Sequence, residues 1–305
     1  MKITANNLEF EVEINEPVGV EVTPDTPTVL LIMGLGMQLI AWPAAFVNAL
    51  TRAGFRVVRL DNRDIGLSHK TSAKIPNLLW MALKHRMRLP LRTDYTLRDM
   101  VEDTRGVLDA LQISRCHVIG VSMGGMIAQG VASHHPSRVA SLISIMSTTG
   151  ARGLPQATPK ATMALLSRPK SKLRADIINH FVRVLGIIGS AKFPTPEADV
   201  RQRIGEAFDR SFYPLGTIKQ MAAIMASGDR SAEVRRITVP TLVIHGNEDL
   251  LVPLKNGEDT AKKIVGSEFE VIDGMGHDLG PLAILLARIV PFLHKNSVAR
   301  TATAL

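Results

Sequence analysis

The sequence contains little cysteine and few aromatic residues. Among 305 residues there is one cysteine, Cys116, and Phe, Trp and Tyr together make up 4%. A single cysteine cannot form an internal disulfide or a cysteine metal cluster, and its place in an apolar stretch predicts a buried thiol. Scarce aromatic side chains leave little for stacking nucleic-acid bases. We therefore expect no metal site and no nucleic-acid partner.

The sequence also lacks a long apolar run and a secretion signal. No stretch approaches the roughly 18 uncharged apolar residues typical of a membrane-spanning helix. Residues 1–10 have no apolar core of signal-peptide length. Hydrophobic residues make up 46% and charged residues 21%, the balance of a folded globular chain and not of a disordered one. These features predict a cytoplasmic protein without an integral membrane segment.

Acidic residues are outnumbered by basic ones. The chain has 36 Lys and Arg against 28 Asp and Glu, a formal net charge of +8. The cations are scattered and no nucleic-acid-binding motif is visible, which favours a solvated basic surface; a cleft that attracts anionic substrates stays open. Residues 70–92 hold basic residues and no acidic one, which predicts either a surface helix or a basic amphipathic contact with a membrane or acidic ligand. Its cations are Lys70, Lys74, Lys84, Arg86, Arg88 and Arg92.

A glycine-rich segment at residues 118–126 predicts a sharp turn between a strand and a helix. The strand is expected at Cys116–Val121 and the helix from Met123. Gly120, Ser122 and Gly124 fit G-x-S-x-G, the pattern of a nucleophile elbow. Such a turn strains the serine backbone and lifts its hydroxyl clear of the sheet. Side chains two positions before and after it would collide, so both are glycine. Ser122 is therefore the candidate nucleophile.

Two later loops offer partners for this serine. Asp249 follows a predicted strand at residues 239–246, and His277 follows a short one at residues 269–272. Each lies where a strand ends, at the edge where open α/β sheets gather their sites. His277 would accept the proton of Ser122 and return it to a leaving group. Asp249 would orient the imidazole and stabilise its charged form.

Neighbouring polar residues could take these roles instead. Glu248 is adjacent to Asp249, but Asp249 lies beyond the turn and has the shorter, less mobile side chain. Asp278 is adjacent to His277 and so is poorly placed to orient it. His245 lies at the end of a buried strand, where a structural hydrogen bond is expected.

The backbone can supply the donors that stabilise an oxyanion. The apolar run at residues 28–33 predicts a buried strand, and the glycine-rich residues 34–37 follow it. Such a loop supplies one N–H, and the residue after the nucleophile supplies the other. The candidates are the N–H groups of Leu35 and Met123. Alternatively, Gly34 and Gly36 form a plain strand-to-helix turn.

Two further segments have a predicted structural role. Residues 8–14 and 18–22 each alternate apolar and polar side chains, which predicts an antiparallel hairpin at the edge of the sheet. The charges at residues 61–68 follow another buried strand. They predict a structural turn with local hydrogen bonds and ion pairs, rather than catalytic groups.

The pattern changes between residues 147 and 236, where proline and glycine interrupt short helical pieces and no buried strand is seen. We interpret this as a helical cap inserted before the penultimate strand of a mostly parallel sheet flanked by helices, an α/β fold. The predicted domains are residues 1–146 and 237–305 for the core and 147–236 for the cap. Candidates for an apolar pocket in the cap are Met163, Leu166, Phe181, Leu185, Phe208, Phe212, Met221 and Met225.

Over nearly its whole length the chain resembles the α/β hydrolase superfamily. The resemblance is carried by Gly-Val-Ser-Met-Gly-Gly at residues 120–125, Gly-Asn-Glu-Asp-Leu-Leu-Val-Pro at 246–253 and Gly-Met-Gly-His at 274–277, in the order serine, acid, histidine. Residues 31–37, 42–43 and 61–68 are similar to the branch containing aclacinomycin methylesterase, and residues 122–126 resemble 3-oxoadipate enol-lactonases. One departure is Met33-Gly34, where many relatives have His-Gly.

This resemblance implies hydrolysis of a small-molecule carboxylic ester or lactone, without a cofactor, through an acyl-enzyme on Ser122. A carbon–carbon bond hydrolase, a perhydrolase or an acyltransferase would use the same triad. The serine argues against the dehalogenases and epoxide hydrolases of this fold, which use aspartate there. A second class is a ligand-binding receptor that keeps the hydrolase fold. A homo-oligomer is compatible with the sequence.

Overall fold

The computed structural model describes residues 1–72, 77, 80–81, 83–84, 87, 89 and 91–297. Their core is an eight-stranded sheet in the order β1-β2-β4-β3-β5-β6-β7-β8. The six strands from β3 to β8 pair in parallel, and β1 and β2 join as an antiparallel edge next to β4. The strands are β1 (Lys2–Ala5), β2 (Leu8–Asn15), β3 (Thr28–Ile32), β4 (Arg56–Leu60), β5 (Cys116–Val121), β6 (Val139–Ile145), β7 (Thr241–Gly246) and β8 (Glu268–Ile272).

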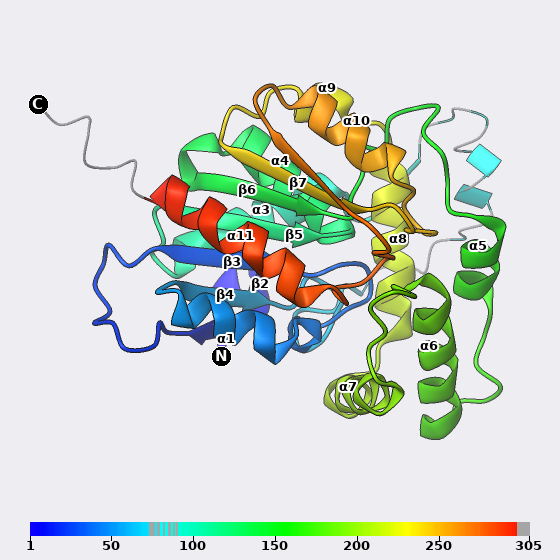
Figure 1. Ribbon diagram of the computed structural model, residues 1–305. Coiled ribbons are helices and arrows are strands. Elements are labelled where there is room, and N and C mark those ends of the chain that lie inside the picture. The colour runs from blue at the N-terminus through cyan, green and yellow to red at the C-terminus, as the bar shows by residue number, and fades with distance from the viewer. Residues whose placement is uncertain are drawn as a thin grey trace, which may run out of the picture.

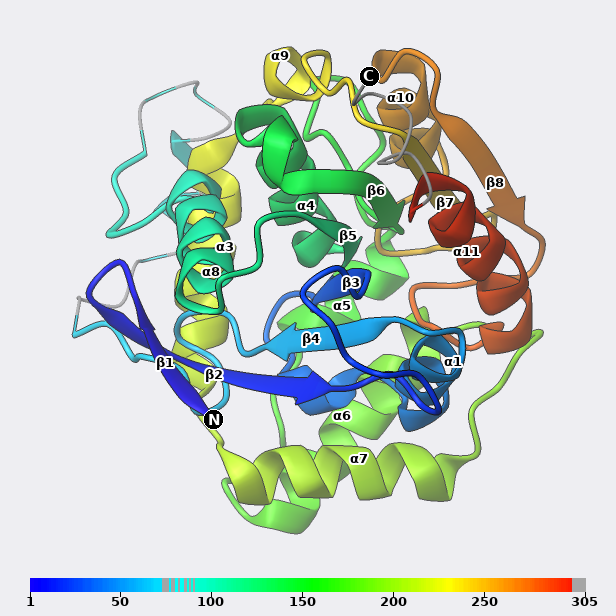
Figure 2. The ribbon, with the colours of Figure 1, turned by 90° about the vertical axis from the view of Figure 1, so that its left-hand side faces the viewer.

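Helices cover both faces of this sheet (Figure 2). One face carries α3 (Leu97–Ala110) and α4 (Met123–His134), and the other carries α1 (Ala44–Arg52) and α11 (Leu282–Ser297). Because successive side chains of a strand point to opposite faces, Val118 joins one buried apolar cluster with Ile127, and Ile119 joins a second with Phe46. Cys116 is buried in β5, and burial raises the pKa of its thiol to about 12, as expected for an unreactive cysteine.

A group of helices between β6 and β7 forms the cap, which lies at one end of the sheet (Figure 1). It comprises α5 (Pro159–Leu166), α6 (Arg174–Ile188), α7 (Glu197–Arg210) and α8 (Pro214–Ser227), whereas the short α9 (Ser231–Val234) lies away from them and packs against α4 (Figure 1). Helix α10 (Lys255–Lys263) and the 3-10 turns η1 (Leu39–Ala41) and η2 (Pro136–Arg138) complete the described elements. The predicted fold class is confirmed. Ala223 of α8 is buried in a cluster with core residues, so this cap helix packs directly on the core. The domain boundaries stay a prediction.

The edge hairpin differs from the prediction. Strand β2 pairs with β1, and residues 18–22 form no strand. Asn6 and Asn7 make the turn with φ of 49° and 61°. Left-handed conformations at both central residues are those of a type I′ hairpin turn, which asparagine tolerates. The other edge of β2 is taken by β4, so the alternating residues 18–22 have no strand to pair with and their valines are exposed.

The basic segment at residues 70–92 falls largely on positions outside the described residues, Lys74, Arg86 and Arg88 among them. The interpretation of that segment stays a prediction. Within the described part of the chain, no helix combines the length and apolarity needed to cross a membrane.

Candidate active site

Ser122 lies between the end of β5 and the start of α4 with φ of 54° and ψ of −120°, a conformation that strains any residue with a side chain. The flanking glycines are required by close contacts. A Cβ at Gly120 would lie 2.2 Å from the carbonyl oxygen of Gly124, and one at Gly124 would lie 2.1 Å from that of Ile32. The segment therefore has the geometry of the predicted nucleophile elbow.

Two further residues, Gly125 and Ser147, fix the position of this elbow relative to β6. A Cβ at Gly125 would lie 2.6 Å from the Cβ of Ser147, so helix α4 approaches the end of β6 as closely as glycine allows. The hydroxyl of Ser147 donates a 2.8 Å hydrogen bond to the carbonyl oxygen of Ser122. This contact helps fix the strained residue.

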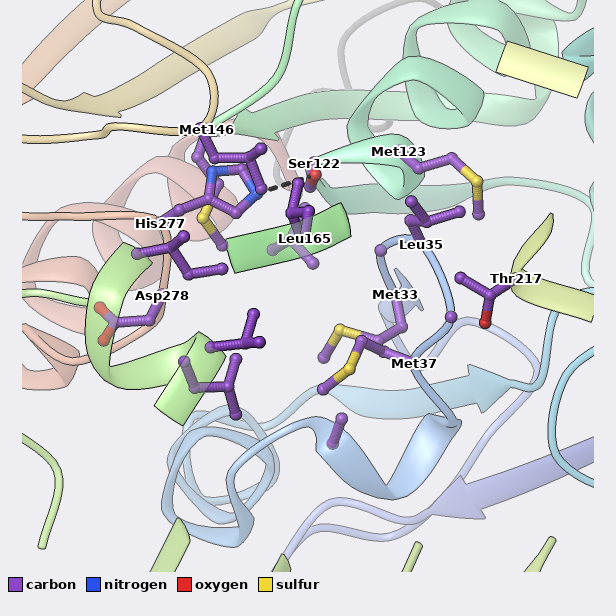
Figure 3. Close-up of a pocket in the computed structure, with 18 of the residues that line it drawn as sticks. Met33, Leu35, Met37, Ser122, Met123, Met146, Leu165, Thr217, His277 and Asp278 are labelled. Atoms are coloured by element: carbon purple, nitrogen blue, oxygen red, sulfur yellow. Dashed lines mark hydrogen bonds between the residues drawn. The ribbon is translucent and has the colours of Figure 1, made fainter. Parts of the chain in front are cut away.

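The structure brings the three predicted triad residues together. Nε2 of His277 lies 2.9 Å from Oγ of Ser122 (Figure 3), and Nδ1 lies 2.7 Å from Oδ2 of Asp249. A carboxylate only accepts hydrogen bonds, so Nδ1–H donates to Asp249 and Nε2 accepts from the serine hydroxyl. The side chains of Asp249 and His277 are 0% and 8% exposed. They follow β7 and β8, as Ser122 follows β5.

The carboxylate of Asp249 is held by the main chain as well. Its Oδ1 accepts hydrogen bonds from the N–H groups of Leu251 and Val252 at 2.9 and 2.8 Å, which leaves Oδ2 for the histidine. Glu248 is exposed. The carboxylate of Asp278 points away from Ser122 (Figure 3) and accepts hydrogen bonds from Ser190 instead. Of the nearby acids, Asp249 alone contacts His277 within the described residues.

His245 has the structural role expected of it. Its Nε2–H donates a 2.7 Å hydrogen bond to the carbonyl oxygen of Val252, and Nε2 lies 3.6 Å from Oδ2 of Asp249. Burial lowers the pKa of His245, so the ring stays neutral beside the acid. A Cβ at Gly257 would lie 2.4 Å from its Nδ1, which shows how tightly the ring is enclosed.

The candidate oxyanion donors flank the serine. Leu35 and Met123 lie beside Ser122 (Figure 3), and a Cβ at Gly34 would lie 3.3 Å from the Cβ of Ser122. Across the residues that the structure describes, the N–H groups of Leu35 and Met123 donate to no protein acceptor. Both N–H groups are thus available to a ligand oxygen.

The turn at residues 61–68 reaches further than the predicted local contacts. Oδ1 of Asp61 accepts a 2.7 Å hydrogen bond from the N–H of Leu39, and Asn62 donates a 3.0 Å bond to the carbonyl oxygen of Met33. Oδ2 of Asp61 pairs with Arg210 of cap helix α7 at 2.7 Å. The turn therefore supports the chain on both sides of residues 34–37, the candidate oxyanion loop. The only sequence signal was its place after β4, the strand beside β3.

A cavity of about 2430 Å³ opens above the serine and is lined by Ser122, His277 and cap residues. Six of the eight predicted apolar residues line it: Phe181, Leu185, Phe208, Phe212, Met221 and Met225. Met163 and Leu166 do not, since they are 68% and 74% exposed on α5. Leu165, absent from the prediction, also lines the cavity and is drawn just below Ser122 in Figure 3. Among the described residues, no group of His, Cys, Asp and Glu side chains could hold a metal ion.

Comparison with known proteins agrees with this geometry. The family described as alpha/beta hydrolase fold matches residues 27–281. RutD of Variovorax paradoxus, which carries the name of a carbamate hydrolase, is 28% identical over 287 residues, with 90% of this chain and 94% of that protein covered. Rhodomycin D methylesterase DnrP of Streptomyces peucetius is 25% identical over 281 residues, with 86% of this chain and 88% of that protein covered.

The fold likeness extends to solved structures. The enol-lactonase from Burkholderia xenovorans LB400 superposes with a TM-score of 0.72 at 23% identity, covering 96% of this chain and 100% of that chain. The resemblance predicted from the sequence motifs is confirmed by the family match. The chain belongs to the alpha/beta hydrolase family and is a hydrolase of the α/β fold.

Proposed function

We propose that the protein is a serine hydrolase that cleaves a carboxylic ester or lactone of a small molecule through an acyl-enzyme on Ser122. The observation that carries the proposal is the continuous hydrogen-bonded chain from Ser122 through His277 to Asp249, with the serine hydroxyl on the wall of the cavity. This arrangement is the one that activates a serine hydroxyl for acyl transfer.

In the first half of the reaction, Oγ of Ser122 attacks the ester carbonyl carbon while Nε2 of His277 takes the hydroxyl proton. The carbonyl electron pair moves onto oxygen, and the N–H groups of Leu35 and Met123 stabilise that oxyanion. When the carbonyl reforms, the alkoxide leaves with the proton from His277. Water then attacks the acyl-enzyme by the same route, and the acid is released from Ser122.

The environment of the serine favours an apolar acyl or alcohol group. Met33, Met37, Met146 and Leu165 line the same cavity as Ser122 (Figure 3). Methionine side chains adapt to ligands of varied shape. The printed names of two similar proteins, a methylesterase and an enol-lactonase, are consistent with ester or lactone chemistry. The cap boundaries at residues 147–236 and the cytoplasmic location are part of this proposal.

The test combines labelling and turnover. Wild type, Ser122→Ala and Ser133→Ala are treated with a fluorophosphonate and assayed with p-nitrophenyl acetate, butyrate and octanoate. Ser133 lies in helix α4, which begins directly after Ser122, and its hydroxyl donates to the carbonyl oxygen of Glu233, away from the triad. We expect Ser122→Ala alone to lose the label, and to lose about 10⁴- to 10⁶-fold in kcat.

The other outcomes separate the alternatives. Labelling of Ser122 in the wild type without measurable turnover of any ester or lactone would favour the receptor. A folded Ser122→Ala variant that keeps more than about a tenth of wild-type turnover would contradict the assignment of the nucleophile.

A further inference from the structure

The oxyanion loop, residues 34–37, lies between the nucleophile and cap helix α8. On one side the missing side chain of Gly34 lets Ser122 approach. On the other, Gly36 has φ of +70°, and a Cβ there would lie 2.8 Å from Oγ1 of Thr217 in α8. The loop is therefore in contact with the core and the cap at once.

Within this loop the N–H of Met37 donates a 3.2 Å hydrogen bond to the carbonyl oxygen of Gly34. With a positive φ at Gly36, this is the pattern of a type II β-turn, in which Leu35 and Gly36 are the central residues. The weak point of such a turn is the peptide between its central residues. If that peptide rotates, ψ of Leu35 and φ of Gly36 change together, because each peptide unit is planar, and the shape of the turn changes.

Gln220 of α8 holds that peptide. Its Oε1 accepts a 2.9 Å hydrogen bond from the N–H of Gly36, and its Nε2 donates a 2.9 Å bond to the carbonyl oxygen of Arg63. The side chain is fully buried. One amide thus joins the oxyanion loop to the turn at residues 61–68, whose Asn62 holds the carbonyl oxygen of Met33.

Helix α8 is a rigid support for this contact. The side chain of Lys219, the residue before Gln220, is 3% exposed. Its Nζ donates a 2.5 Å hydrogen bond to the carbonyl oxygen of Thr71. One turn earlier, a Cβ at Gly216 would lie 1.9 Å from the carbonyl oxygen of Asp64. Such close backbone approach leaves little freedom for the helix to shift relative to the core.

We propose that Gln220 is a positioning residue of the oxyanion hole: by fixing the Leu35–Gly36 peptide, this cap side chain holds residues 34–37 in the turn that presents the Leu35 N–H to the oxyanion. The inference rests on the proposed function. Helix α8 then acts as a fixed wall of the catalytic centre. Preorganised donors of this kind stabilise an oxyanion without rearranging during the reaction.

The test compares Gln220→Met, Gln220→Glu and Gln129→Met. Methionine keeps the shape of glutamine and removes both strong hydrogen bonds, whereas glutamate keeps an acceptor for Gly36. Gln129 of α4 is the matched control, because it is 1% exposed and also makes two side-chain contacts, to Ser144 and Arg230.

Three readouts are taken: kcat and KM on p-nitrophenyl butyrate with their pH profiles, thermal unfolding, and hydrogen exchange of the peptide containing Gly36. For Gln220→Met we expect kcat to fall about 10- to 100-fold with KM nearly unchanged, somewhat less than the loss of a whole oxyanion donor. The pH profile should keep its shape, since His277 is untouched, and exchange at Gly36 should accelerate. Gln220→Glu should recover most of the activity.

Gln129→Met should unfold at a lowered temperature comparable with that of Gln220→Met, but with normal kcat and normal exchange at Gly36. A folded Gln220→Met variant with kcat within about twofold of wild type would overturn the inference. So would an equal loss of kcat in Gln129→Met, which would mark a general effect of losing a buried amide. Failure of the proposed function would look different: wild type itself would turn over no ester, whereas exchange at Gly36 would still respond to Gln220→Met.

Discussion

The main-chain N–H of His277 donates a 2.7 Å hydrogen bond to the carbonyl oxygen of Ile188, the last residue of helix α6. The next residue, Asp278, accepts hydrogen bonds from Ser190 just beyond that helix. The loop that presents the imidazole is therefore anchored to the cap, as the candidate oxyanion loop is anchored to α8. The cap thus supports the geometry of the candidate active site and also lines its cavity.

The acid is tested by a pair of adjacent substitutions. Asp249→Asn keeps the shape of the side chain but places an amide against Nδ1 of His277, which favours the wrong tautomer. We expect kcat to fall on the order of 10⁴-fold, as in other triads. Glu248→Gln should have little effect, because that side chain is exposed. Steady-state kinetics with one activated ester at several pH values decide; damage confined to Glu248→Gln would refute the assignment.

The strain at Ser122 predicts that the nucleophile lowers stability. Ser122→Gly should be inactive yet more stable than Ser122→Ala by about 1 kcal/mol, because glycine accepts a φ of 54° without penalty. The same pair at Ser133, inside helix α4, should behave oppositely, with glycine about 1 kcal/mol less stable than alanine. Chemical denaturation of the four variants measures both differences. Equal stabilities at position 122 would argue against stored strain.

Two neighbouring leucines of α5 test the pocket. Leu165 lines the cavity near Ser122, whereas Leu166 is 74% exposed and does not line it. Leu165→Ala enlarges the space near the serine, so the preferred acyl chain should lengthen and kcat/KM for long against short p-nitrophenyl esters should rise several-fold, in keeping with roughly 1 to 3 kcal/mol for a methylene-scale change. Leu166→Ala should leave that ratio unchanged. Identical ratios in both variants would place the acyl group elsewhere.

Acid stability depends in part on His117. The ring is 2% exposed and contacts Ser141 and Ser297. Burial, together with nearby Arg115, lowers the pKa of His117 from its ordinary value of about 6.5 to about 4. Between these pH values the histidine takes up a proton in the unfolded chain but not in the folded protein. The contribution of His117 to the free energy of unfolding is therefore fully present above pH ~6.5 and is lost as the pH falls toward ~4, by up to about 3 kcal/mol.

The variant His117→Gln should therefore lose less stability than wild type between pH 7 and pH 4, although it is less stable at pH 7. His69→Gln, which removes an exposed histidine beyond β4, serves as the control. Urea titrations across this range provide the measurement. Parallel pH dependence in wild type and His117→Gln would show that the ring titrates normally in the folded state.

The triad could be predicted from the sequence because each member has a local signal. Ser122 lies in a short glycine pattern, and Asp249 and His277 each follow an apolar strand in the expected chain order. Parallel strands then bring their carboxyl ends together at one edge of the sheet. Local pattern and topology lead to the same three residues, and the structure brings them within hydrogen-bonding distance, at 2.7 and 2.9 Å. Their catalytic roles stay a prediction.

The supports of the site carry no such signal. Gln220 lies 184 residues from Gly36 in sequence, and Arg210 lies 149 from Asp61. Neither position stands out from its helix, because a buried glutamine and a paired arginine look like surface residues until the packing is known. The edge hairpin shows the opposite limit: alternation at residues 18–22 predicts a strand, but the Asn6-Asn7 turn commits β2 to a different partner.

The single thiol described in β5 makes this protein suited to site-specific labelling. Cys116 is enclosed by the core and its pKa is about 12, so in the folded state it is inert to maleimides at neutral pH. A second cysteine at an exposed position, such as Val265→Cys at a site that is 92% exposed, would carry one fluorophore, and Cys116 would not need to be replaced. Because Cys116 is buried, the rate at which a thiol reagent modifies it reports the rate or extent of opening of the central sheet, and the measurement requires no substrate.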